Sequence, residues 1–151
     1  MPPPLLPQRV ARRLLATGVT SFCPTIVSSS PATYAASTRV FADLARQTAR
    51  RHAEALAGEP RTASDGTPGA RVLGLHLEGP FIALERRGAH APEHLRAPRD
   101  GAASLDSVYG PHADWEGGGV RIVTLAPELP GALEAVRALA ARGVVASIGH
   151  T

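Results

Sequence analysis

The stretch that decides the fold is Arg71-Val72-Leu73-Gly74-Leu75-His76-Leu77-Glu78-Gly79-Pro80. This run is short and mostly apolar, and it stops at a Gly-Pro pair, which is typical of a buried β-strand that ends in a turn. Glu78 therefore lies at the carboxyl end of a predicted strand. His76 lies two residues before it, so the two side chains share one face of that strand.

Strands and helices alternate along the chain on both sides of this run. We predict the other strands at residues 19–23, 120–125 and 144–148, and helices at residues 7–16, 31–56 and 130–142. Pro24 follows the first of these strands and is expected to end it. Apolar strands that alternate with helices favour a parallel α/β architecture.

The length of the chain limits what this architecture can be. The chain has 151 residues, whereas a complete (β/α)8 barrel typically needs about 250 residues. The last predicted strand is followed only by Gly149-His150-Thr151, without the helix that normally covers such a strand. We therefore expect a truncated chain.

The domain organisation is expected to be simple, with a single domain over residues 1–151. Residues 82–119 show no sustained periodicity, and loops of this length inside a domain are usually functional or disordered. We place this loop on the active-site side. The other irregular segments are a Pro-rich start at residues 1–7 and a flexible loop at residues 58–70.

The charge of the chain argues against a nucleic-acid partner. The formal net charge is +3 and the 16 basic residues are all Arg, with a sequence pI of about 10.0. These arginines are spread along the chain, without the clustered basic face and stacking aromatics that nucleic-acid binding needs. A small anionic substrate remains compatible with this charge.

The single cysteine, Cys23, and the short apolar runs indicate where in the cell the protein is expected. A lone cysteine cannot form an internal disulfide, and we interpret it as a buried thiol in a strand. No apolar run approaches the roughly 20 residues of a membrane helix, and the N-terminus lacks the apolar core of a signal peptide. We expect a cytoplasmic protein without a membrane partner.

Glu78 and His150 are the main candidates for functional residues. Glu78 directly follows the apolar part of its predicted strand, and His150 follows the last predicted strand after one glycine. In parallel α/β folds, ligands bind beyond the carboxyl ends of the strands. A carboxylate and an imidazole that meet there could bind a divalent metal ion. The alternative is a glutamate that accepts hydrogen bonds within a turn, and an exposed histidine.

Other polar residues have weaker support. For His76 we favour a core or supporting position over a ligand. His90, in Gly88-Ala89-His90, could face a substrate if the long loop folds back, or it could remain exposed. We expect Glu128 to cap the helix that starts at Pro130. Histidines without a supporting context are interpreted as surface residues: His52, His94 and His112.

Five strings occur in one order along the chain and are more specific than these spacings. They are Gly18-Val19-Thr20-Ser21-Phe22-Cys23-Pro24-Thr25, Leu73-Gly74-Leu75-His76-Leu77-Glu78-Gly79-Pro80-Phe81-Ile82, Gly88-Ala89-His90, Val120-Arg121-Ile122-Val123-Thr124-Leu125-Ala126-Pro127-Glu128 and Ser147-Ile148-Gly149-His150-Thr151. This series closely resembles N-acetylglucosamine-6-phosphate deacetylases of the amidohydrolase superfamily. The similarity runs from about residue 14 to residue 151, and fades at 46–70 and 98–118.

This resemblance implies a partial (β/α)8 TIM barrel, about its first half without the first strand. It implies that Glu78 and His150 are metal ligands, that Ala89 and His90 contact substrate, and that the cofactor is a divalent metal ion, with zinc preferred. The implied reaction converts N-acetylglucosamine 6-phosphate to glucosamine 6-phosphate and acetate. No catalytic residue is assigned to this chain, because the family's catalytic Asp is expected beyond Thr151. The full-length form is expected to be a homodimer.

Two different interpretations remain open at this point. The first is another amidohydrolase on the same barrel with a changed substrate. The second is a truncated product without catalytic activity. In either case we expect the isolated chain to be inactive, because half of a barrel leaves open sheet edges and an uncovered apolar face.

Overall fold

The computed structural model describes residues 6–58, 69–110 and 113–151. Most of the Pro-rich start and of the loop at 58–70, as well as His112, lie outside the described residues. The elements in chain order are α1 Leu6–Leu15, β1 Ser21–Phe22, β2 Thr25–Val27, α2 Pro31–Leu56, β3 Arg71–Val72, β4 Leu75–Glu78, η2 Leu84–Arg86, η3 Pro92–His94, α3 Ala102–Tyr109, β5 Val120–Leu125, α4 Ala132–Ala141 and β6 Val145–Ile148.

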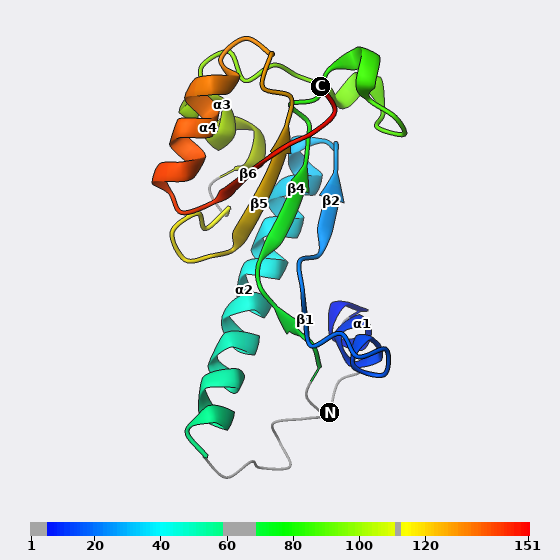
Figure 1. The fold of residues 1–151 in the computed structure, drawn as a ribbon, viewed down its shortest axis with the longest axis vertical. Helices are drawn as coiled ribbons and strands as arrows, with labels where there is room; N and C mark the ends of the chain where they lie inside the picture. The colour runs from blue at the N-terminus through cyan, green and yellow to red at the C-terminus, as the bar shows by residue number, and fades with distance from the viewer. Residues whose placement is uncertain (1–5, 59–68, 111–112) are drawn as a thin grey trace.

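A four-stranded parallel sheet lies in the upper half of the molecule as drawn in Figure 1. Its strand order is β2-β4-β5-β6, and every pair is parallel. One row of the sheet joins Val27, Glu78, Thr124 and Ser147 as register partners. The predicted parallel α/β class is therefore confirmed, and Glu78 lies in a central strand of the sheet.

The structure corrects the sequence prediction at two strands: the prediction misses β2, and it takes β3 and β4 as one strand. Instead of one strand at 19–23, β1 precedes Pro24 and β2 follows it. The second predicted strand is divided into β3 and β4, with Gly74 between them at φ +130°. A Cβ at Gly74 would lie 2.5 Å from the Gly118 carbonyl oxygen, so close backbone approach requires glycine there. β1 and β3 pair as a separate small sheet.

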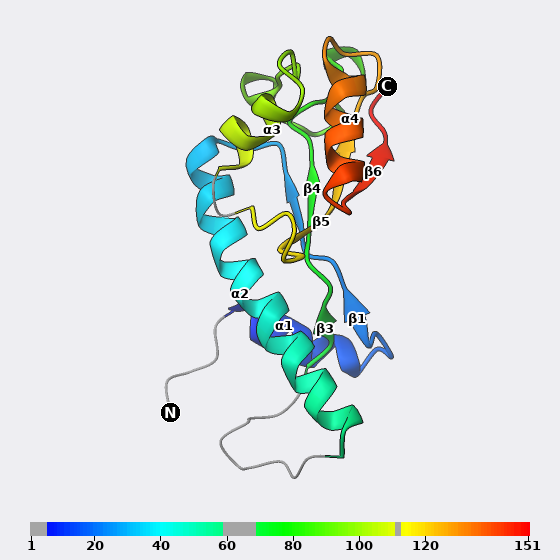
Figure 2. The same ribbon diagram turned by 90° about the vertical axis from the view of Figure 1, so that its left-hand side faces the viewer.

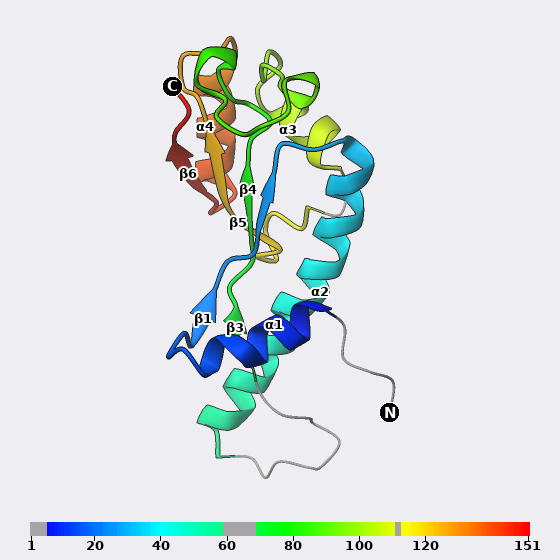
Figure 3. The same cartoon turned by 90° about the vertical axis from the view of Figure 1, so that its right-hand side faces the viewer.

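Helices α2, α3 and α4 lie on one side of the large sheet, as Figures 2 and 3 show from opposite directions. The β4 and β5 side chains that face these helices are fully buried: Leu75, Leu77, Val123 and Leu125. Side chains on the other face are less covered. Val27 and Val145 are 52% and 55% exposed. Alternate residues of a strand point to opposite faces, so Glu78 and His76 belong to this open face.

Helix α2 begins and ends where the sequence predicts. The Ser30 hydroxyl accepts a hydrogen bond from the Thr33 N–H at 3.2 Å, and Pro31 is the first helical residue. Both features favour a helix start. The helix contacts β3, β4 and α3, so it joins the small sheet to the large one. Neither α2 nor any other helix in the described part of the chain is long and apolar enough to cross a membrane.

The segment 82–119 is not a structureless loop, contrary to the sequence prediction. It contains η2, η3 and the eight-residue helix α3. Helix α3 is too short to show clear periodicity, and a helix of this length depends on tertiary packing. That packing comes from Tyr109, whose ring makes edge-to-face contacts with Tyr34, Phe81 and Trp115 at centroid distances of 5.1, 5.7 and 5.8 Å.

Tyr109 also fixes the turn that follows Glu78. Its buried hydroxyl donates to the Gly79 carbonyl oxygen at 2.8 Å. Burial and the nearby Tyr34 raise the pKa of Tyr109 well above its usual value, so the hydroxyl keeps its proton and remains a donor. The folded-back segment thus supports the strand end where the candidate ligand lies.

Replacing Tyr109 by Phe should therefore lower the free energy of unfolding by about 1–3 kcal/mol, since it leaves the buried Gly79 carbonyl without its donor. Urea unfolding followed by circular dichroism would measure this. Ser107→Ala, on the exposed side of α3, is the control and should change stability by less than about 0.5 kcal/mol. Equal stability of Tyr109→Phe and the original chain would show that this bond does not support the turn.

Candidate metal centre

Three side chains from distant parts of the sequence meet at the carboxyl edge of the sheet. Glu78 is the last residue of β4, His150 follows β6, and His90 lies between η2 and η3. Each offers one ligand atom, and these atoms all lie within 4.8 Å of one another. Among the described residues, this group of carboxylate and imidazoles could hold a metal ion.

Glu78 and His150 are in direct contact. The Glu78 Oε1 atom lies 3.0 Å from His150 Nε2. This hydrogen bond is the main cause that lowers the pKa of Glu78 and raises the pKa of His150. The two side chains are half-buried, at 29% and 24% exposure, so solvent still reaches them. The ionised carboxylate of Glu78 can only accept, so His150 Nε2 is the donor. A cation that displaces this proton would lie between the carboxylate and the imidazole.

The second ring nitrogen of His150 has a defined role. Nδ1 lies 2.9 Å from the Arg86 carbonyl oxygen, which can only accept, so Nδ1 carries a proton and donates it. Metal-binding histidines usually make such a bond with the nitrogen that does not bind the metal. The backbone of His150 has φ +57°, an uncommon conformation for a residue other than glycine.

His90 is the most buried member of the group, at 6% exposure. Its Nε2 lies 3.8 Å from Glu78 Oε1, and its ring stands edge-to-face with that of His150 at 4.8 Å between centroids. Burial is the first cause that lowers the pKa of His90, followed by the charge of nearby His150. On its other side, Nδ1 faces the Ser28 hydroxyl at 2.8 Å and the Ser28 N–H at 3.2 Å.

The structure brings together Glu78, His90 and His150. Ala89 is exposed beside His90. His76 lies one layer below the group, where its two ring nitrogens contact the hydroxyls of Thr25 and Thr124 at 3.1 and 2.8 Å. Burial lowers the pKa of His76. It connects β2, β4 and β5 on the open face of the sheet.

The three-residue group does not include Glu128, His52, His94 or Cys23. Glu128 does not cap helix α4, contrary to the sequence prediction: the N-cap, Gly131, has no side-chain cap bond, and Glu128 accepts from the Thr151 hydroxyl at 2.6 Å. His52 is exposed and His94 is half-buried. Cys23 is half-buried between β1 and β2, and burial raises its pKa.

Ser28 is a site residue that the sequence prediction misses. It is 4% exposed and directly follows β2, in the same way that other site residues follow their strands. Because Pro24 is expected to end the strand, the sequence does not place Ser28 at a strand end. The apolar pair Ile26-Val27, followed by three serines, is the one local signal that the strand resumes.

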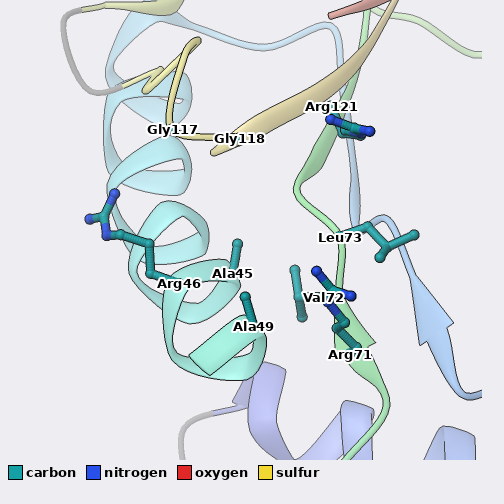
Figure 4. Close-up of a pocket in the computed structure, with 9 residues that line it drawn as sticks. All are labelled: Ala45, Arg46, Ala49, Arg71, Val72, Leu73, Gly117, Gly118 and Arg121. Atoms are coloured by element: carbon teal, nitrogen blue, oxygen red, sulfur yellow. The ribbon is translucent and has the colours of Figure 1, made fainter. Parts of the chain in front are cut away.

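A separate cavity of about 310 Å³ lies near β3 and the start of β5, at the amino ends of the strands (Figure 4). Ala45, Ala49 and Val72 line it, and Arg71 and Arg121 are at its border. Arg71 Nε is buried without a hydrogen-bond partner. This cavity is at the opposite end of the sheet from the three-residue group, so it is not part of the candidate metal centre.

The fold and the site together define a parallel α/β chain with a candidate metal centre at the carboxyl edge of its sheet. Among curated proteins, the chain is 46% identical over 143 residues to N-acetylglucosamine-6-phosphate deacetylase of Homo sapiens, covering 94% of this chain and 29% of that protein. The same enzyme of Danio rerio is 41% identical over 143 residues, covering 94% and 30%. Over nearly its whole length the chain is therefore homologous to one segment of N-acetylglucosamine-6-phosphate deacetylases, as its motifs predict.

A further curated relative matches over part of the chain. The chain is 41% identical over 86 residues to N-acetylgalactosamine-6-phosphate deacetylase of Escherichia coli O157:H7, which covers 57% of this chain and 21% of that protein. It spans less than a third of the curated relatives that it matches. No protein-family model matches it.

Solved structures agree with the sequence comparison. N-acetyl-D-glucosamine-6-phosphate deacetylase from Mycobacterium smegmatis matches with a TM-score of 0.59 and 31% identity, covering 87% of this chain and 28% of that one. A mutant of that enzyme, in complex with N-acetyl-D-glucosamine-6-phosphate, matches with a TM-score of 0.58 and 32% identity over 87% of this chain and 27% of that one. The enzyme from Thermotoga maritima matches with a TM-score of 0.57 and 27% identity, covering 94% and 31%.

The close packing around Glu78 can be tested at Gly79. Its φ is +81°, and a Cβ there would lie 2.3 Å from Ser28 Oγ and 2.8 Å from Ile82 Cδ1. Gly118 is the matched control, since its φ is +78° and nothing lies within 4 Å of its Cβ position. Both Gly→Ala variants carry the left-handed penalty of about 1–2 kcal/mol, but Gly79→Ala should lose a further 1–3 kcal/mol, roughly, through overpacking.

Urea unfolding of both variants measures this difference. If Gly79→Ala and Gly118→Ala lose the same stability, the contact between Ser28 and the turn after Glu78 is not tight.

Proposed function

We propose that this chain is part of an N-acetylglucosamine-6-phosphate deacetylase, which hydrolyses the 2-acetamido group of the sugar phosphate to give glucosamine 6-phosphate and acetate. The observation that carries the proposal is the meeting of Glu78, His90 and His150 at the carboxyl edge of the sheet, in a chain 46% identical to such an enzyme. Polar groups at this edge are where parallel α/β folds bind their ligands.

A divalent metal ion fits the donors at this site. Glu78 offers a carboxylate oxygen, and His150 offers Nε2 while its Nδ1 is held by the Arg86 carbonyl. Carboxylate and imidazole ligands suit zinc, and we assign Glu78 and His150 as its ligands from this chain. When bound, such an ion would polarise the amide carbonyl and lower the pKa of a water molecule.

The other residues of the site contact the substrate in this proposal. His90 faces the centre with Nε2, and Ala89 is exposed beside it, so a sugar phosphate could lie against this pair. We assign no general acid or base to the chain. The one carboxylate in the three-residue group is Glu78, and it is already hydrogen-bonded to His150.

We also infer that the four-stranded sheet belongs to a (β/α)8 barrel, about its first half without the first strand. In support, the strands are parallel, and the described helices α2, α3 and α4 lie on one side of the sheet. Parallel sheets are normally covered on both faces, and the open face here combines polar residues with the exposed Val27 and Val145. The homodimer and the cytoplasmic location remain predictions.

The ligand assignment can be tested by Glu78→Gln, which removes the carboxylate charge with little change in shape. We expect this variant to bind Zn²⁺ more than about tenfold more weakly. Replacing a residue that only supports a metal ligand already weakens binding by about 10–100-fold. Glu128→Gln is the matched control, since Glu128 also follows a strand but contacts Thr151 instead. Metal analysis and calorimetry would measure both, and unchanged Zn²⁺ binding by Glu78→Gln would remove Glu78 from the ligand set.

The activity can be tested by exchange of segments. Residues 14–151 would replace the matching segment of the Mycobacterium smegmatis deacetylase, and acetate release from N-acetylglucosamine 6-phosphate would be followed. We expect the chimera to be active and the same chimera with Glu78→Gln to lose activity. We expect residues 1–151 alone to release no acetate.

A chimera with the human segment at the same junctions is the control for the exchange itself. If that control is active and the chimera with this chain is not, the proposed function is wrong.

A second candidate substrate is N-acetylgalactosamine 6-phosphate, which differs from the first only in configuration at C4. The similarity to the N-acetylgalactosamine-6-phosphate deacetylase of Escherichia coli O157:H7 supports this candidate. Acetate release from the two sugar phosphates, measured side by side with the active chimera, separates the two substrates.

A further inference from the structure

Ser28 is hydrogen-bonded to His90, the histidine that we assign to the substrate. We propose that Ser28 is a positioning residue that holds His90 in the tautomer with its proton on Nε2, so that His90 donates a hydrogen bond into the site and does not bind the metal. The proposal rests on the proposed function in one respect, namely that the group which accepts the His90 hydrogen bond belongs to the substrate. The tautomer itself follows from the geometry of Ser28 and His90.

The backbone N–H and the hydroxyl of Ser28 together determine which nitrogen of His90 carries the proton. The Ser28 N–H points at His90 Nδ1 over 3.2 Å, and a backbone N–H can only donate. Nδ1 must therefore offer its lone pair. The Ser28 hydroxyl, at 2.8 Å from the same nitrogen, can donate to that lone pair as well. A neutral imidazole has one proton, which is then on Nε2.

His150 has the opposite arrangement. Its Nδ1 donates to the Arg86 carbonyl, so Nε2 is the nitrogen that can offer a lone pair to a metal ion. The two imidazoles stand edge-to-face. His150 Nε2 now donates to Glu78 and would offer its lone pair once a metal ion displaces that proton, whereas His90 Nε2 presents an N–H. Although proximity alone groups His90 with the ligands, its tautomer makes it a donor. A suitable acceptor is a carbonyl or hydroxyl oxygen of the substrate.

The position of Ser28 is restricted by the turn after Glu78. Ser28 is 4% exposed, and its Oγ lies where a side chain on Gly79 would be, 2.3 Å from the Cβ position. A small residue with a hydroxyl therefore fits between this turn and His90. Alanine would fit but would lose the hydroxyl, and threonine would keep it.

The test is the protonation pattern of His90 in the full chain, labelled with ¹⁵N-histidine. Proton–nitrogen correlation spectra distinguish a ring nitrogen with a proton from one without, and His90→Gln identifies the signal. We expect an unprotonated Nδ1 and a protonated Nε2 in the original chain and in Ser28→Thr. Ser28→Ala should show an approximately threefold to tenfold shift toward the other tautomer, the size expected for one hydrogen bond.

A protonated Nδ1 in the original chain would overturn the proposal, and so would an unchanged tautomer ratio in Ser28→Ala. The spectrum of the original chain gives an answer even if Ser28→Ala does not fold. Because no substrate is used, failure of deacetylase activity and failure of this assignment are separate results.

Zn²⁺ binding provides a second, independent readout. We expect His150→Asn to weaken Zn²⁺ binding more than about 100-fold, beyond the usual effect of an outer partner, and His90→Asn to weaken it less than about tenfold. Equal losses in the two variants would make His90 a third ligand and contradict the proposal.

Discussion

Parallel pairing of β2, β4, β5 and β6 brings the side chains of the candidate metal centre together. Because these strands run in one direction, their carboxyl ends are brought to one edge of the sheet. Glu78, Ser28 and the residues after β6 are separated widely in sequence but reach the same place for this reason. The segment after Glu78 then returns over that edge, anchored by Tyr109 on the Gly79 carbonyl, and adds His90.

The two histidines of the site show how backbone groups can give identical side chains different chemistry. A carbonyl oxygen holds one ring and a backbone N–H holds the other. Neither group can change its role, so the role of Nδ1 in each imidazole is fixed before any ligand arrives. Distance alone treats both rings as possible ligands, and the hydrogen bonds on their outer sides distinguish them.

Much of the fold can be predicted from sequence, because hydrophobic runs bounded by Gly and Pro are local signals. The sequence predicts β5 residue by residue, and Ser30-Pro31 predicts the start of α2. Features that depend on contacts between distant parts of the chain cannot be predicted from such local signals. The break at Gly74 depends on the approach of Gly118, and helix α3 depends on a cluster of aromatic rings from other elements. In the candidate site, Glu78 and His150 can be predicted because each lies at the end of a predicted strand. Ser28 is missed because Pro24 is expected to end the strand before it.

The left-handed backbone of His150, at φ +57°, has a consequence for protein engineering. An L-residue in this conformation costs about 1–2 kcal/mol that glycine would avoid. Design methods that optimise stability alone would therefore tend to place glycine here and remove the imidazole. Functional positions often depart from the local optimum of the backbone. A thermostable version of this chain that retains the candidate metal centre would therefore have to keep His150 and seek its stability elsewhere.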